Sequence, residues 1–95
     1  MRGRSRGAVL VSIAGLVVMI AERRGERVLV REGTSQPDVA RAAAALVNYL
    51  AARGSRDLII ETIDGQPSSG SRHIDAFLGA GLRRGTTGLR FYRRV

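Results

Sequence analysis

The chain contains no cysteine, no lysine and no tryptophan, and only 4% of its residues are aromatic. Without cysteine, neither a disulfide framework nor a thiolate metal site can form, and a reducing cytoplasm is the expected compartment. The scarcity of aromatic residues means that the core must consist of Val, Ile, Leu and Ala. Ninety-five residues make one domain, which folds alone only if nearly all its apolar segments meet in one core.

Recognisable catalytic motifs are also missing. No glycine-rich loop ending in Gly-Lys-Ser or Gly-Lys-Thr is present, which excludes a P-loop nucleotide site, and no closely spaced His pair or acidic cluster offers metal ligands. His73 is the only histidine and follows Ser68, Ser69 and Ser71. Asp75 would lie on a different side of the helix, so no carboxylate is expected to orient the imidazole. The sequence predicts no enzyme, no cofactor, no metal and no small-molecule substrate.

The run Ala8–Ala21 follows three arginines and has the outline of a signal peptide. It is too short for a membrane-spanning helix, which needs about 20 residues, and Met19 is too large for the −3 position of a cleavage site. Its many β-branched residues favour strands. We therefore expect strands at Ala8–Ile13 and Leu16–Ala21, joined by a turn at Ala14–Gly15, and no membrane contact. A secreted or membrane protein would instead need this run to be helical.

A third strand, Arg27–Arg31, is expected after the charged turn around Gly25. Ser35 then resembles a helix cap with Asp38 three residues later, as in a capping box. Apolar residues follow at helical spacing: Val39, Ala42, Ala43, Leu46, Val47 and Leu50. The pattern predicts a helix over Gln36–Arg53 that ends at Gly54.

The second half begins with Asp57–Ile63, whose apolar residues occupy both faces and predict one central strand. Glu61 and Asp64 could be drawn as paired carboxylates, but Asp64–Gly65 reads better as a turn in which the Asp side chain bonds nearby backbone N–H groups. The elements expected next are a loop over Pro67–Ser71, a short helix over Arg72–Ala80 stopped by Gly81, a loop over Arg83–Thr86 and a last strand over Thr87–Arg94.

The predicted order is β-β-β-α-β-α-β. It corresponds to an α+β fold with a mostly antiparallel sheet of about five strands, one long and one short helix, in two layers. Residues 1–7 are Gly- and Arg-rich and are predicted to be a flexible basic tail, and residues 8–95 to form a single domain.

The most distinctive property of the composition is its charge: 16 arginines face 8 acidic residues, which gives a net charge of +8. Such a balance favours a polyanionic partner or an acidic neighbouring domain. Arg90, Tyr92 and Arg94 alternate on the last predicted strand, and Arg83 and Arg84 lie close in sequence. An aromatic ring between guanidinium groups can stack on a base while the arginines hold phosphates. These five residues are the candidate nucleic-acid contacts, and a solvated or interdomain face is the alternative.

Several segments resemble the C-terminal end of bacterial large helicase-related (Lhr) proteins, which are ATP-dependent superfamily 2 DNA helicases linked to DNA repair. The resemblance covers roughly residues 8–94. It is carried by Ile60–Pro67, the Ala80-Gly81-Leu82 helix end, Thr87–Arg90 and the opening apolar hairpin. The chain differs in having Ala14-Gly15 where the family tends to have Asp-Gly, and Leu82 where an aromatic is common.

The resemblance implies a non-catalytic accessory module that binds DNA or docks on the helicase motor, whose ATP site would lie upstream. No catalytic residue can be transferred from the family to this sequence. The alternative function is a structural or assembly module with no direct nucleic-acid contact.

Overall fold

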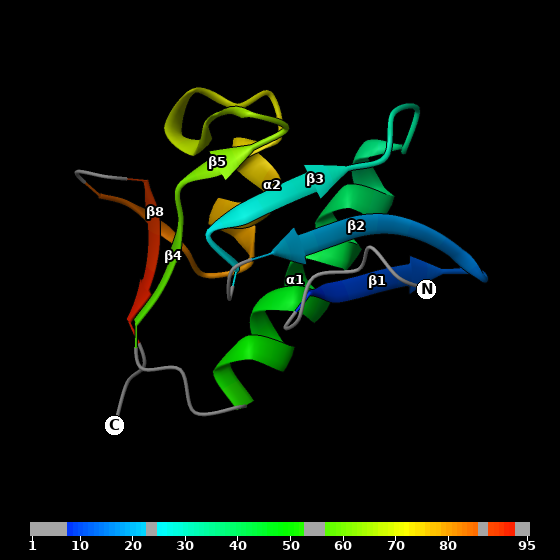
Figure 1. Cartoon of the computed structure of the whole chain (residues 1–95), viewed down its shortest axis with the longest axis horizontal. Helices are drawn as coiled ribbons and strands as arrows, with labels where there is room; N and C mark the ends of the chain where they lie inside the picture. Colours follow the sequence, from blue (N-terminus) through cyan, green and yellow to red (C-terminus); the bar gives the residue numbers. More distant parts are fainter. Residues whose placement is uncertain (1–7, 23–24, 53–56, 86–87, 93–95) are drawn as a thin grey trace.

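The computed structural model describes residues 8–22, 25–52, 57–85 and 88–92, with the backbone alone for Asp57, Phe91 and Tyr92. It is an α+β fold in which two helices lie behind the larger of two sheets, and the smaller sheet stands beside them (Figure 1). The predicted fold class is therefore confirmed. The predicted basic tail, residues 1–7, and the predicted helix stop at Gly54 lie outside the described residues.

The opening apolar run forms two strands, as predicted. Strand β1 (Val9–Ile13) pairs antiparallel with β2 (Leu16–Glu22), and β2 pairs antiparallel with β3 (Arg27–Val30). Ala14 and Gly15 have φ values of 55° and 83°, as the two central residues of a type I′ hairpin turn require. Within the described ranges, neither helix has the length and apolar character that a membrane-spanning helix needs.

Helix α1 (Gln36–Ala52) covers the back of β1 and β2 (Figure 1). The Asp38 N–H donates to the Ser35 Oγ at 3.4 Å, so Ser35 caps the helix as predicted. The Asp38 carboxylate lies 3.6 Å from the Arg41 guanidinium, and it forms an ion pair there. All six apolar residues of the predicted stripe are buried: Val39, Ala42, Ala43, Leu46, Val47 and Leu50.

The predicted single strand Asp57–Ile63 is wrong, because the segment is two strands in two different sheets. Its first part, β4 (Asp57–Ile60), pairs antiparallel with β8 (Leu89–Tyr92). Its second part, β5 (Thr62–Ile63), pairs parallel with β3 and antiparallel with β6 (Gln66–Pro67). One sheet has the order β1-β2-β3-β5-β6, and the other has the order β4-β8-β7, where β7 is Arg83–Arg84.

The change of sheet occurs at Glu61, where backbone groups are bonded to two other segments and a third approaches closely. The Glu61 N–H donates to the Glu26 carbonyl at 2.8 Å, and the Glu61 carbonyl accepts the Ser68 N–H at 2.9 Å. The Ser68 hydroxyl, which is fully buried, donates to the Ile60 carbonyl at 2.6 Å. Gly88 approaches so closely that a Cβ there would lie 2.4 Å from the Ile60 carbonyl oxygen. These bonds leave Glu61 outside both ladders.

Helix α2 (Ile74–Gly79) is shorter at both ends than the predicted Arg72–Ala80. It is preceded by a 3₁₀ turn, η2 (Ser68–Gly70), inside the predicted loop. Gly81 has φ 108°, and the Leu82 N–H donates to the Phe77 carbonyl at 3.2 Å, as in a Schellman C-cap. Gly81 therefore ends the helix as predicted, and it lets the fully buried Phe77 anchor α2 to the core.

We predict that Gly88→Ala lowers the free energy of unfolding by at least about 2 kcal/mol, because the new methyl group overlaps the Ile60 carbonyl and overpacking of this kind is destabilising. The measurement is urea denaturation followed by circular dichroism. Gly79→Ala is the matched control, because nothing lies within 4 Å of its Cβ position and alanine is the better helix former by up to about 1 kcal/mol. Equal stability of the two variants would contradict the close approach.

Candidate nucleic-acid interface

Three of the five predicted contact residues meet on one hairpin. Strands β7 and β8 pair antiparallel, with Arg83 opposite Arg90 and Arg84 opposite Leu89. The predicted loop over Arg83–Thr86 is therefore corrected at its start, since Arg83 and Arg84 form the edge strand of the smaller sheet. A two-residue strand carries no periodic signal that a sequence pattern could reveal.

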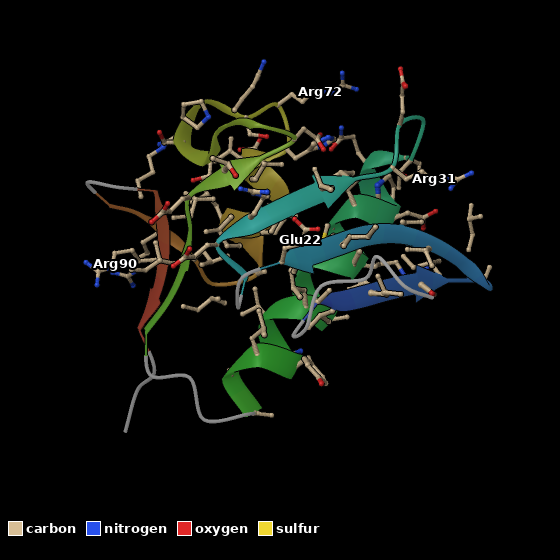
Figure 2. The ribbon with its side chains drawn as sticks, in the orientation of Figure 1. Glu22, Arg31, Arg72 and Arg90 are labelled. Carbon is tan, nitrogen blue, oxygen red and sulfur yellow. The ribbon has the colours of Figure 1, made fainter. Side chains whose placement is uncertain are left out.

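The base of the Arg90 side chain is held by the hairpin itself. The Gly85 N–H donates to the Gly88 carbonyl at 2.7 Å, which closes the hairpin. A Cβ at Gly85 would lie only 2.9 Å from the Arg90 Cδ and 3.0 Å from its Cγ. Because Gly85 has no side chain, the aliphatic part of Arg90 can pack against the Gly85 backbone. The Arg90 side chain is half-buried there (Figure 2).

Arg83 and Arg90 occupy directly opposed positions on neighbouring strands, where their Cβ atoms are expected to be about 5 Å apart. Like charges in that relation destabilise a strand pair. Arg83 and Arg84 are exposed, and neither has a carboxylate within 4 Å among the described residues. An anion could contact these two exposed guanidinium groups. The competing explanation is that charges on an edge strand prevent pairing with another chain.

The structure does not describe the side chains of the other two predicted contacts, Tyr92 and Arg94. For Tyr92 it describes the backbone alone, which pairs with Asp57 in the β4–β8 ladder. Arg94 lies outside the described residues. The proposed stacking of a base on Tyr92 therefore stays a prediction.

A carboxylate does lie beside His73, contrary to the prediction from Asp75. The His73 Nε2 is 3.7 Å from the Asp64 Oδ2, and the imidazole is almost completely buried. The prediction was wrong because it considered only Asp75, which lies two residues after His73 on the same short helix. Asp64 arrives from the β5–β6 turn, and no spacing in the sequence links that turn to α2.

The turn at Asp64–Gly65 is confirmed, and both residues have positive φ values of 55° and 79°. The backbone group that the Asp64 side chain binds is distant in sequence, however. Its Oδ1 accepts the Val30 N–H at 2.8 Å, whereas a nearby N–H was predicted. Asp64 thus joins the end of β3 to the β5–β6 turn and to His73.

Two of the three nearby serines, Ser68 and Ser71, are engaged elsewhere. The Ser71 Oγ accepts the N–H of His73 itself at 3.0 Å, and the Ser68 hydroxyl is bonded to the Ile60 carbonyl. Neither hydroxyl is hydrogen-bonded to the imidazole, so the described residues do not assemble a Ser–His–Asp relay of the kind that acyl transfer requires.

No protein-family model matches the chain, and neither a curated protein nor a solved structure matches it. The likeness to the helicase family accordingly stays a prediction made from the sequence.

We predict that Asp64→Ala lowers the free energy of unfolding by about 2 kcal/mol. The substitution removes the acceptor of the Val30 N–H. It also places alanine in the left-handed region, which alanine tolerates less well than aspartate does. Asp64→Gly removes the same bond without backbone strain and is expected to lose about 1 kcal/mol. Asp64→Asn keeps an acceptor and is expected to lose less than either.

Urea denaturation of the three variants measures these differences. If Asp64→Asn is as unstable as Asp64→Ala, the charge opposite His73 contributes more than the acceptor does, and the explanation above is wrong.

Proposed function

We propose that this chain is a non-catalytic accessory module of an Lhr-like DNA helicase, and that it binds DNA phosphates through the β7–β8 hairpin. The observation that carries the proposal is the cross-strand register, which sets Arg83 opposite Arg90 with Arg84 next to it on an open edge. The net charge of +8 supports it, as does the resemblance of most of the chain to the C-terminal end of that helicase family.

The chemistry of the hairpin suits phosphate more than base edges. A guanidinium group binds phosphate oxygens through two parallel hydrogen bonds, and the exposed Arg83 and Arg84 can each bind one phosphate. Such contacts fix the position of a nucleic acid without reading its sequence. The module would therefore add affinity and register to a motor that supplies the ATP chemistry.

A second candidate function is a structural or assembly module with no nucleic-acid contact. It is favoured by an apolar row across the outer face of the larger sheet, where Leu10, Ile20 and Leu29 are cross-strand neighbours. Leu10 is 47% exposed and Leu29 is 39% exposed. In a longer helicase the neighbouring motor would cover this row, and the hairpin arginines would only keep the edge strand from pairing.

We predict that the isolated chain binds a fluorescently labelled single-stranded oligonucleotide, and that its affinity falls steeply as salt rises. Arg83→Gln and Arg84→Gln should each lower the slope of log affinity against log salt by about 0.7, the value for one phosphate contact on a single strand. The double variant should lose about twice as much. Fluorescence anisotropy over a salt series measures both quantities, and the matching duplex is titrated in parallel.

Arg41→Gln is the matched control, because it removes one exposed positive charge from α1, where Arg41 is paired with Asp38. Its slope should equal that of the unaltered chain. An equal loss for Arg41→Gln and Arg83→Gln would mean that net charge alone attracts DNA. No binding at low salt would reject direct contact and leave the assembly function.

A further inference from the structure

Two further arginines, Arg31 and Arg72, line a cleft of about 320 Å³ that is separate from the hairpin. The cleft lies between the end of β3 with the loop after it, the β5–β6 turn and the turn before α2, and its lining also includes Glu32, Asp64 and His73. Figure 2 shows Arg31 and Arg90 near opposite ends of the long axis of the molecule. The cleft therefore requires its own explanation.

The walls of the cleft are fixed by hydrogen bonds. Arg31 donates its N–H to the Val18 carbonyl at 2.8 Å, and the Thr34 hydroxyl donates to the Arg31 carbonyl at 2.7 Å. On the other wall, Asp64 holds the Val30 N–H. A site whose walls are already in place loses less entropy when a ligand binds than a flexible loop would.

His73 forms part of the buried wall of the cleft. The residue is only 6% exposed, and its Nε2 lies 3.7 Å from the Asp64 Oδ2. Its Nδ1 is itself buried, so this nitrogen is not placed to contact a ligand. His73 therefore helps to fix the position of Asp64 and does not hold the ligand.

Two guanidinium groups complete the arrangement. Arg31 and Arg72 are exposed at the cleft, and neither has a carboxylate within 4 Å in the described part of the chain. Asp64 is already bonded to Val30 and lies beside His73, which leaves Glu32 as the one acidic residue of the lining that is not engaged in this way. Two exposed arginines at one small cleft suit a group with several negative oxygens.

We propose that this cleft binds a phosphate group, held by Arg31 and Arg72 and opposed by Glu32. The volume is at the small end of ligand pockets, so it fits one phosphate with a short attachment. The phosphate could be a free or metabolite phosphate, or the terminal phosphate of a nucleic acid. Only the nucleic-acid source depends on the function proposed above.

The test is an NMR titration of the ¹⁵N-labelled chain with inorganic phosphate, and then with short oligonucleotides that carry either a 5′-phosphate or a 5′-hydroxyl. Phosphate should shift the amide signals of residues 31–34, 64 and 72–73. Arg31→Gln and Arg72→Gln should each weaken phosphate binding about tenfold or more, as expected for loss of a charge-assisted bond. Glu32→Gln should strengthen it, because it removes a repelling carboxylate.

Arg41→Gln is again the control and should leave the phosphate affinity unchanged. Tighter binding of the 5′-phosphate than of the 5′-hydroxyl oligonucleotide identifies a nucleic-acid end, and binding of inorganic phosphate without that preference identifies a small phosphorylated ligand. The proposal is overturned if the cleft amides do not respond to phosphate, or if the Arg31 and Arg72 variants bind it as the Arg41 variant does. Arg83→Gln/Arg84→Gln should keep phosphate binding at the cleft, so the two proposals fail separately.

Discussion

The close approach of Gly88 to the Ile60 carbonyl is the constraint on which the arrangement of the two sheets depends. A side chain at Gly88 would overlap both that carbonyl oxygen and the Ser68 hydroxyl that is bonded to it. Because β8 can come this close, it pairs with β4 up to Ile60. The chain then has to leave that ladder at Glu61, and its next two residues join β3 instead.

Both charged surfaces follow from this change of sheet. Pairing of β8 with β4 and β7 brings Arg90 to the position opposite Arg83. Pairing of β5 with β3 brings the following turn to the end of β3, where Asp64 binds the Val30 N–H and lies beside His73. A single backbone crossing therefore positions the hairpin on one side of the molecule and the cleft on another (Figure 2).

Features that depend on residues close together in the sequence were predicted correctly. The turn at Ala14–Gly15, the Ser35 cap and the buried stripe of α1 were all readable, because each depends on residues within a few positions of one another. The break at Glu61 was not predicted, since apolar residues continue on both sides of it and the groups that contact the backbone there, at Glu26, Ser68 and Gly88, belong to other segments of the chain. The Asp64–His73 pair was missed for the same reason, because tertiary structure alone brings the two residues together.

The two surfaces differ in how they can hold an anion. Arg83 and Arg84 project from an open edge strand, where water and salt compete for the phosphate and the contribution of each charge is small. At the cleft Arg31 and Arg72 are also exposed, so salt screens them as well. The difference is that hydrogen bonds from the Val30 N–H to Asp64 and from the Thr34 hydroxyl to Arg31 set the walls of the cleft before a ligand arrives. An extended polyanion would thus gain most of its affinity from many exposed arginines, whereas a single phosphate would depend on two arginines at one preformed cleft.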